Sequence, residues 1–483
     1  MDGTELHRAE ATRPVIIQGG MGVAVSGWRL AREVARAGQL GVVSGTALDA
    51  VVARRLQDGD EGGHIRRALR HFPSRGIASR VLERFFRPDG RGGHPYRPHP
   101  AIDLHPSPAA IELALVGNFA EVWLAKEGHE GIIGVNMLEK IQTATLSAIL
   151  GAMLAGVDYV LMGAGVPLEI PKLLNDFAAG RTGDVTVAVA NATRPYGASL
   201  DPVKVLSDDL PVLKRPKFLA IVSLPLLAGF LNRSEATRPD GFVVEGPRAG
   251  GHSAPPRGKM TIDGDGQPVY GVRDEANLSA MTTIGLPFWL AGAYATPERV
   301  ADAVAAGAEG VQVGTLFAFA EESGLRPDLR QQLLRRLADG SLTVRNDPLA
   351  SPTGFPFKIA DVEGTLSDPA IYAARERICN LGFLRTPAER ADGTLTYRCA
   401  AEPAHMYVRK GGDVADTAGR ICLCNGLLAD IGLGQVRRDG HVEDAVITLG
   451  QDLSGPQQLL ETHPDGWTAA EAVRWLTGSL PAA

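Results

Sequence analysis

The sequence predicts an α/β fold: a TIM (β/α)8 barrel with lid insertions and an appended cysteine-containing C-terminal segment. One phrase recurs three times, at 30–45, 148–165 and 300–315, and each copy reads as an amphipathic helix, a short turn and an apolar strand. The strands are continuously apolar, which is typical of parallel strands buried on both faces. Eight such strands, each followed by a helix, favour a barrel. The expected strands are 15–19, 40–45, 131–136, 158–163, 217–223, 241–246, 287–292 and 310–315.

The turns of this repeat support the same interpretation. Gly38, Gly156 and Gly307 follow the three helices and suit the left-handed position just past a helix end. A doubly wound open sheet is the rival architecture, but no G-x-G-x-x-G motif opens a helix after the first strand. A ninth strand, 184–190, is expected within an insertion.

The chain divides into three parts by composition. Residues 1–365 form the predicted barrel, with insertions at about 60–125 and 254–285 that follow strand ends. Segments in that position lie over the active face of a barrel, so both are expected to form a lid. Residues 366–450 are polar and glycine-rich and contain every cysteine of the chain. Residues 451–483 are a helical tail, with a surface helix that Thr468 caps and Leu476 anchors on its apolar side.

Composition excludes several classes of protein. The 483 residues are 45% hydrophobic and 22% charged with a net charge of −6, which is ordinary for a soluble globular protein and offers no electrostatic footprint for nucleic acid. The apolar stretch 145–170 contains Asp158, four glycines and a proline, so a helix followed by a buried strand is expected rather than a membrane span. The charged N-terminus lacks the apolar region of a secretory signal. We therefore expect a cytoplasmic protein that binds neither nucleic acid nor membrane.

Small and polar residues at the strand ends indicate where ligands bind. Gly19–Gly22 follows the first expected strand and Asn136 ends the third. The carboxyl ends of barrel strands form the catalytic mouth, and small residues let the backbone approach a ligand closely. The loops after the last two strands are the usual phosphate site of a barrel, and Thr296 and Pro297 can begin a helix there.

Several motifs together resemble one known family. They are "PVIIQGGMGVAVSGWRLAREVARAGQLGVVS", "GVNM", "FVVEGPRAGGH", "PFWLAGAYATPERVADAVAAGAEGVQVGTLFAFAEES" and "SPTGFPFK", in order over roughly residues 13–360. In that order and spacing they resemble the nitronate monooxygenase (2-nitropropane dioxygenase-like) family of FMN-dependent TIM barrels. This group includes the trans-acting enoyl reductases of polyunsaturated fatty acid synthases.

The resemblance implies a cofactor and a catalytic residue. His252 matches the family's active-site histidine, and an unperturbed histidine titrates near neutrality and can exchange a proton at cellular pH. Gly250 and Gly251 would pass close to FMN. The backbone at Met21 and Gly22 would meet the flavin ring. The other implied contacts are Asn136 on the ring edge or ribityl chain, and Gly251, Gly292, Ala293, Gln312, Gly314 and Thr315 around the phosphate. The insertion 254–285 directly follows His252 and is expected to reshape the substrate pocket.

The four cysteines form the second candidate site. Cys379, Cys399, Cys422 and Cys424 lie within 46 residues of one another in the C-terminal segment. A reducing compartment argues against disulfides, and four thiolates suit zinc or an iron–sulfur cluster, although the spacing lacks paired C-x2-C motifs. The stretch "ICLCNGLLADIGLG" resembles the tail of flavin and iron–sulfur acyl dehydrogenase/isomerases, which favours [4Fe–4S] over zinc. Burial as small apolar side chains is the alternative.

The combined interpretation is an FMN-dependent oxidoreductase, nitronate monooxygenase-like, that oxidises alkyl nitronates with O2. The alternative is a flavin-dependent enoyl reductase or dehydrogenase/isomerase that acts on acyl thioesters in fatty-acid or polyketide biosynthesis. A flavin-binding protein without catalysis is a third option, which the intact "GGH" motif disfavours. The partner is then a small-molecule or acyl-thioester substrate. The sequence does not fix the oligomeric state, and a homodimer stays open.

Overall fold

The computed structural model describes residues 13–478 of the chain. The residues before and after, including the charged stretch for which no secretory signal is expected, lie outside this range. Eight parallel strands form one sheet in the order β1-β10-β9-β8-β7-β4-β3-β2. Their bounds are β1 Ile16–Gln18, β2 Gly41–Ser44, β3 Ile133–Leu138, β4 Tyr159–Gly163, β7 Lys217–Val222, β8 Gly241–Glu245, β9 Phe288–Ala291 and β10 Gly310–Val313.

The sheet closes on itself between β1 and the start of β2. The amide of Gln18 donates to the carbonyl of Leu40 at 3.0 Å, and the amide of Leu40 donates to the carbonyl of Ile16 at 3.1 Å. Ile17 and Leu40 pair in parallel. All eight expected strands are therefore present, and closure confirms the TIM barrel over the open sheet.

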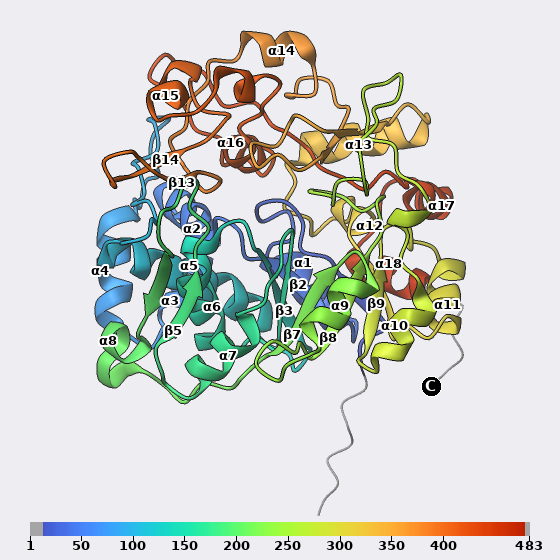
Figure 1. Cartoon of the computed structure of the whole chain (residues 1–483), viewed down its shortest axis with the longest axis horizontal. Helices are drawn as coiled ribbons and strands as arrows, with labels where there is room; N and C mark the ends of the chain where they lie inside the picture. Colours follow the sequence, from blue (N-terminus) through green and yellow to red (C-terminus); the bar gives the residue numbers. More distant parts are fainter. Residues whose placement is uncertain (1–12, 479–483) are drawn as a thin grey trace, which may run out of the picture.

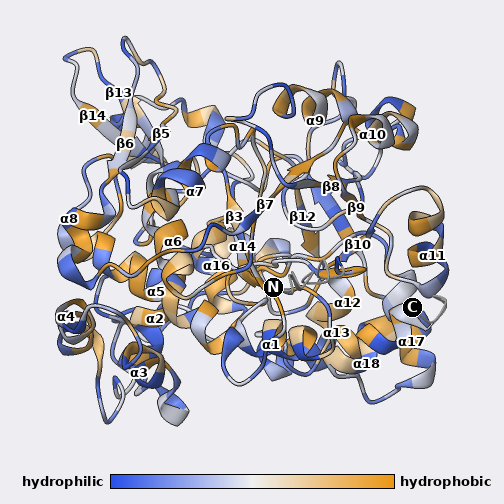
Figure 2. Cartoon of the chain, turned by 90° about the horizontal axis from the view of Figure 1, so that it is seen from below, coloured by the Kyte–Doolittle hydropathy of each residue, from blue (hydrophilic) through white to orange (hydrophobic). Residues whose placement is uncertain are grey.

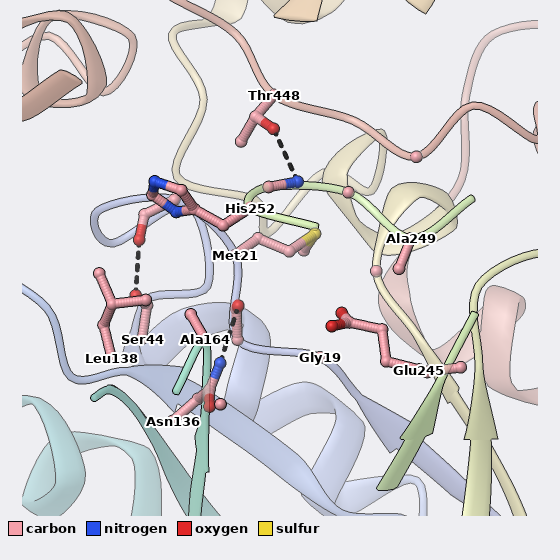
Figure 3. Close-up of a pocket in the computed structure, with 18 of the residues that line it drawn as sticks. Gly19, Met21, Ser44, Asn136, Leu138, Ala164, Glu245, Ala249, His252 and Thr448 are labelled. Atoms are coloured by element: carbon pink, nitrogen blue, oxygen red, sulfur yellow. Dashed lines mark hydrogen bonds between the residues drawn. The ribbon is translucent and has the colours of Figure 1, made fainter. Parts of the chain in front are cut away.

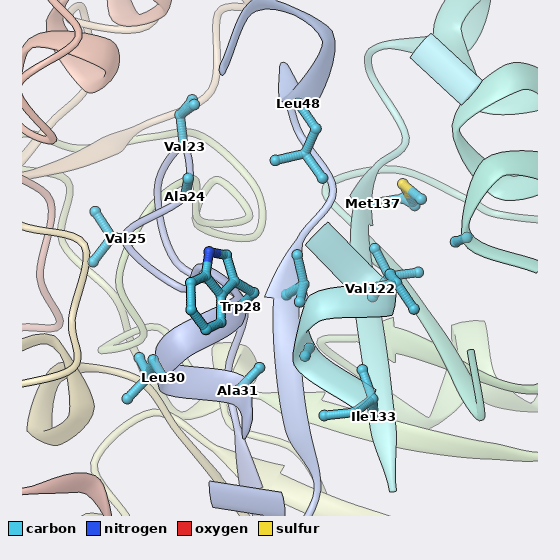
Figure 4. Packing of buried hydrophobic residues seen from close by; sticks show 14 of the residues in the cluster. Val23, Ala24, Val25, Trp28, Leu30, Ala31, Leu48, Val122, Ile133 and Met137 are labelled. Atoms are coloured by element: carbon cyan, nitrogen blue, oxygen red, sulfur yellow. The ribbon is translucent and has the colours of Figure 1, made fainter. Parts of the chain in front are cut away.

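The two faces of the strands pack into separate apolar cores. One face fills the barrel interior, where branched and aromatic side chains from alternate positions meet. The other face packs against the surrounding helices, and Figure 4 shows Trp28, Leu30 and Ala31 packed there near Ile133 and Val122. The interior cluster consists of Ile17, Leu40, Val42, Tyr159, Leu161, Leu219, Ile221, Val243, Trp289 and Ala291.

A ring of helices surrounds the strands (Figure 2). The predicted left-handed glycines occur as expected, with φ of 79° at Gly38, 73° at Gly156 and 92° at Gly307. The apolar stretch 145–170 divides into a helix and a strand, as predicted. The ring helices are α1 Trp28–Arg36, α5 Pro108–Lys126, α6 Gln142–Leu154, α7 Ile170–Ala178, α9 Pro225–Leu231, α10 Leu278–Ile284, α11 Pro297–Ala305 and α18 Ala469–Thr477.

The last ring position is filled from the C-terminal end of the described chain, because α18 packs between α11 and α1. Thr468 caps α18 as predicted, and its hydroxyl accepts from the amide of Glu471 while the Glu471 carboxylate accepts from the amide of Thr468. Leu476 is fully buried, and so is Trp467, whose indole donates to the carbonyl of Leu316 at 3.0 Å. The predicted surface helix is therefore an integral part of the barrel.

The long connection after β2 runs mostly along the side of the barrel. It contains α2 Leu48–Gln57, α3 His64–Leu69 and α4 Arg75–Phe85, which pack on α5. Helix α5 is apolar and long enough by composition to cross a membrane, but 72% of its most apolar window is buried within the protein. The stretch before α5 reaches the C-terminal segment, where the amide of Leu104 donates to the Tyr397 hydroxyl at 3.0 Å, and Arg54 of α2 donates to the carbonyl of Leu433 there.

The expected ninth strand lies outside the barrel. It forms β5 Gly183–Thr186, which pairs in antiparallel fashion with β6 Gly197–Leu200, and α8 Pro202–Leu206 follows. This hairpin is an excursion between β4 and β7. It extends toward the C-terminal segment, where the amide of Ala190 donates to the carbonyl of Pro387 at 2.9 Å.

The segment after β10 covers one end of the barrel before it returns to the ring (Figure 1). It adds two antiparallel hairpins, β11 with β12 and β13 with β14. The covered end is the one at which the strands finish, so this segment faces the expected mouth. Its elements are α12 Thr315–Ala318, α13 Pro327–Ala338, β11 Val344–Asp347, β12 Phe357–Ala360, α14 Pro369–Ala374, β13 Thr386–Glu389, β14 Leu395–Arg398, α15 Ala404–Arg409, α16 Leu423–Ala429 and α17 Ser454–Thr462.

Candidate active site

One large cavity lies between the carboxyl ends of the strands and the C-terminal segment. It encloses about 1560 Å³ of empty space, counted with its open mouth. The structure brings every residue predicted for the flavin site to its wall: Met21, Gly22, Asn136, Gly250, Gly251, His252, Gly292, Ala293, Gln312, Gly314 and Thr315.

Ser26 and Gln18 hold the first loop of the cavity. The Ser26 hydroxyl donates to the carbonyl of Gly19 at 2.9 Å and accepts from the amide of Met21 at 2.9 Å. The Gln18 amide group donates to the same hydroxyl at 2.8 Å. The Met21 amide is therefore occupied within the protein. The amide of Gly22, where φ is 54°, has no such partner among residues 13–478 and is therefore available to a ligand.

Two buried amide side chains present oxygens to the cavity without a protein partner. The Asn136 Nδ2 donates to the carbonyl of Gly20 at 3.3 Å (Figure 3), and its Oδ1 accepts no hydrogen bond from the described residues. The Oε1 of Gln312 is unpartnered in the same way. Buried polar atoms of this kind require a partner. An isoalloxazine ring with its N–H and carbonyl groups provides donors and acceptors for both amides, so these residues fit FMN.

The "GGH" loop is fixed by the segment that covers the barrel. The amide of Gly251 donates to the Thr448 hydroxyl at 3.0 Å (Figure 3), and the carbonyl of Gly251 accepts from the amide of Lys358 at 3.0 Å. A Cβ on Gly250 would lie 2.9 Å from the carbonyl carbon of Leu449. Gly250 is therefore required for the close approach of another chain segment as well as for an open cavity wall, while Gly251 supplies the left-handed turn with φ of 75°.

His252 is held in a neutral state. Its Nε2 lies 2.7 Å from the Ser351 hydroxyl, and its ring meets the ring of Phe357 edge to face at 4.9 Å between centroids. Burial, aided by the Lys140 ammonium, lowers the pKa of His252 to about 3. The expectation that His252 titrates near neutrality is therefore wrong for the unliganded protein, because the imidazole is desolvated and no carboxylate pairs with it.

The loops after β9 and β10 adopt the tight turns expected of a phosphate site. Gly292 and Ala293 both have positive φ, 85° and 70°, and the latter is a conformation that alanine rarely adopts. Thr296 caps α11 as predicted, and its hydroxyl accepts from the amide of Arg299 at 3.3 Å. Arg248 also lines the cavity and is only loosely paired, at 3.8 Å from Asp452. An arginine is well suited to a phosphate.

The remaining wall is apolar and comes from the C-terminal segment. Leu423, Leu427 and Phe383 line the cavity together with Leu138 and Ile141. A small recess adjoins this region, shares Leu138, Ile141 and Phe383 with it, and continues to residues of α5 and α6; its lining is mostly apolar but includes Asp49 and Asn118. The cavity is therefore polar at the glycine loops and apolar at its other side.

The insertion 254–285 does not take the expected position. None of its residues lies among those that line the large cavity, but Glu275, Ala276 and Leu278 line a neighbouring pocket that shares Arg248 and the Gly292–Ala293 loop with it. Gln267 instead accepts from the amide of Asn346 at 2.7 Å, and Tyr270 receives a hydrogen bond from the Asn346 side chain at 3.2 Å. The insertion packs outward against β11, and α10 joins the ring. Its sequence position next to His252 was misleading, because the C-terminal segment supplies that side of the cavity.

The four cysteines come together beside this wall. Cys399 and Cys422 are buried in one cluster, Cys379 and Cys424 pack against it, and Cys424 lines the cavity. Burial raises the pKa of the Cys422 and Cys424 thiols, so both are protonated at neutral pH. Within residues 13–478 no three His, Cys, Asp or Glu side chains are close enough to hold one metal ion. The arrangement thus does not fit a single-ion zinc site, and metal binding stays a prediction.

Four residues of the site escaped the sequence-based interpretation. Glu245 and Arg248 lie on the cavity wall within the quoted motif "FVVEGPRAGGH", and Ser351 and Lys358 lie in "SPTGFPFK". Their motifs were recognised, but the role of each side chain depends on contacts between β8 and the hairpin of β11 and β12. Only Glu245, as a charged residue at the end of an apolar strand, carried a local signal.

Comparison with known proteins locates the resemblance in the chain. Among solved structures, the chain is similar to FabK from Thermotoga maritima, with 16% identity, coverage of 97% of this chain and 92% of that one, and a TM-score of 0.45. It is also similar to a nitroalkane oxidase from Streptomyces ansochromogenes, with 16% identity, coverage of 97% and 95%, and a TM-score of 0.44. No curated protein matches the chain. The family described as nitronate monooxygenase matches residues 208–347, which run from before β7 to the end of β11. This match supports an oxidoreductase, and it lies in the part of the chain that carries the later motifs of the resemblance.

Proposed function

We propose that the protein is an FMN-dependent oxidoreductase that acts on acyl thioesters. The observation that carries this proposal is the shape of the cavity, which has a polar half lined by glycine loops and an apolar half that continues into the recess beside α6. The polar half suits a flavin, and the apolar half suits an acyl chain. The match to the nitronate monooxygenase family supports a flavin enzyme.

The residues that would hold FMN are distributed around the polar half. Asn136 and Gln312 would complete their hydrogen bonds on the ring and ribityl chain. The phosphate would lie at the loops of Gly292–Ala293 and Gly314–Thr315, with Arg248 as its cation. A bound FMN supplies reversible two-electron transfer to and from carbon.

The chain's own residues would orient the substrate and exclude water. The side chains of Leu138, Ile141 and Leu427 desolvate the acyl chain, and their burial favours longer chains by the hydrophobic effect. His252 is fixed by Ser351 through one ring nitrogen, and its Nδ1 has no partner among residues 13–478. A neutral imidazole in this position would hydrogen-bond the substrate carbonyl.

Oxidation of alkyl nitronates with O2 is the second candidate function. The family match over residues 208–347 favours it, and the same flavin site would serve it. A small nitronate would leave the apolar recess empty. Substrate size therefore separates the two candidates.

The test is to reconstitute the purified protein with FMN, record its visible spectrum and mix the anaerobically reduced protein with enoyl thioesters of increasing chain length. We expect flavin reoxidation that becomes faster as the chain grows. Ala144→Leu, which narrows the recess, should raise KM for long chains only, whereas the exposed control Ala179→Leu should not. Failure to bind FMN would refute both candidates. Turnover of alkyl nitronates in air without reaction of any thioester would establish the second candidate instead.

A further inference from the structure

Two groups of opposite charge at the active site, Lys358 and Glu245, have no role in the function proposed above. Lys358 in β12 is completely buried, and its Nζ has no hydrogen-bond partner among residues 13–478. Glu245 ends β8 and lines the cavity, and its carboxylate likewise receives no hydrogen bond from the described residues. A buried ammonium without a partner is costly, so its retention requires an explanation.

A backbone hydrogen bond and a strand pairing fix the positions from which the Lys358 and Glu245 side chains project. The amide of Lys358 donates to the carbonyl of Gly251, and Glu245 pairs with Ala291 of the neighbouring strand. Lys358 therefore lies next to the "GGH" loop, and Glu245 lies at the end of the strand that leads into that loop. The Glu245 side chain points inward, toward the loop that contains Gly19 and Met21 (Figure 3).

We propose that Glu245 is a second acid–base group of the active site, which delivers a proton to the substrate, and that Lys358 is the positioning residue that controls its charge. This inference rests on the proposed function, because the step that uses the proton is the reduction of an acyl thioester.

The proposed step balances in electrons and protons. A bound reduced FMN would supply a hydride to the β-carbon of an enoyl thioester, and the π bond of the alkene would break. The α-carbon forms its new C–H bond with the proton of the Glu245 carboxyl group. The Glu245 carboxylate that results is stabilised by the Lys358 ammonium and regains a proton from solvent. In the dehydrogenase direction, the Glu245 carboxylate would accept a proton from the α-carbon, and the β-carbon would lose a hydride.

The charges around the cavity agree with this division of roles. Burial raises the pKa of Glu245 to about 7, against the opposing effect of Lys358, so the carboxyl group holds a proton at neutral pH and can release it. Burial lowers the pKa of Lys358 to about 8, against the opposing effect of Glu245. The other charged groups on the wall, Arg248 and Asp452, face each other, and His252 is neutral.

Infrared titration of the purified protein tests the pair without any catalysis. Burial also raises the pKa of Asp49 and Asp430, so the test uses the difference between the wild-type and Glu245→Gln spectra, in which bands common to both proteins cancel. Between pH 5 and 9 we expect this difference to contain one protonated-carboxyl band that disappears near pH 7, and the band should persist to higher pH in Lys358→Met because the stabilising ammonium is gone. Exposed Glu321→Gln is the matched control and should keep the signal. A band that titrates near pH 7 in the wild type and still does so in Glu245→Gln would overturn the proposal.

The kinetic test uses the FMN-loaded protein. Glu245→Gln should slow the reoxidation of reduced flavin by an enoyl thioester by about 100-fold with little change in KM, since general acid catalysis contributes about 10²–10⁴. Glu245→Asp should recover part of that rate and confirms that the variant fold is sound. An unchanged rate and pH profile in Glu245→Gln would refute the role. Absence of any thioester reaction in the wild type would refute the proposed function alone, because the infrared titration still decides whether the pair holds a proton.

Discussion

The Nε2 of His252 lies 2.7 Å from the hydroxyl oxygen of Ser351, a residue from a hairpin that follows the barrel. The Ser351 hydroxyl in turn lies 2.8 Å from that of Thr353. The imidazole at the end of β8 is thus oriented by a loop that the barrel itself does not contain. Activity at His252 should depend on that loop.

Ser351→Ala removes the group that orients His252. We expect turnover to fall about tenfold, since one hydrogen bond contributes about 0.5–1.5 kcal/mol, while FMN affinity stays unchanged. Steady-state kinetics and flavin titration measure the two effects. Ser253→Ala is the matched control, because its hydroxyl bonds Tyr270 at 3.2 Å and not His252. Equal losses in both variants would contradict the orienting role.

His252 should make the fold sensitive to acid. Its pKa is about 3 in the folded protein and about 6.5 in an unfolded chain, so the unfolded state binds more protons between these values. Its contribution is complete above pH 6.5 and decreases as the pH falls toward 3, with a loss of about 1 kcal/mol at pH 5.5. Denaturant unfolding at pH 7.5 and 5.5 should show a smaller acid effect in His252→Asn. The exposed control His405→Asn should lose as much stability between pH 7.5 and 5.5 as the wild type loses.

Gly250→Ala should displace the wall of the cavity. The new Cβ would lie 2.9 Å from the carbonyl carbon of Leu449 and 3.0 Å from the amide nitrogen of Gly450. Overpacking of this kind costs about 1–3 kcal/mol, so both FMN affinity and the unfolding midpoint should fall. Gly264→Ala, which meets open space, should change neither. If Gly250→Ala keeps the wild-type FMN affinity and unfolding midpoint, the Gly250 loop and the segment of Leu449 can move apart at little cost.

Trp467→Ala should destabilise the whole barrel. The side chain is fully buried and its indole donates to Leu316, so we expect a loss of about 3–5 kcal/mol in the free energy of unfolding. Thermal unfolding followed by circular dichroism measures this loss. The half-buried Trp475→Ala should cost clearly less. A small effect at Trp467 would mean that α18 is dispensable.

Elemental analysis of the purified protein tests the four cysteines. If the four cysteines bind an iron–sulfur cluster, we expect about four iron atoms per chain and a brown absorbance. About one zinc per chain would instead mean that the cysteines rearrange to form a single-ion site. Cys422→Ser and Cys424→Ser should each abolish the metal. Four thiols that react freely after unfolding, with no metal present, would show that the cluster is only a packed core.

The barrel strands were predictable because each is a continuously apolar run with small residues at its end, and the glycines after the helices marked the turns. The position of α18 was not predictable, since the chain leaves the barrel for well over a hundred residues and its apolar helix face does not reveal its neighbours. Glu245 and Lys358 illustrate the same limit at the site. Both occur in recognised motifs, but only the contact of β12 with the "GGH" loop places them together.

The eighth ring position is occupied by residues that the ribosome makes long after the last barrel strand. Roughly 160 residues separate β10 from the end of α18. At a synthesis rate of about 5–20 residues per second, the faces of α1 and α11 stay uncovered for roughly ten to thirty seconds after the final strand has been made. During that interval the nascent barrel is open on one side, and it depends on chaperones or slow collapse until Leu476 and Trp467 arrive to close it.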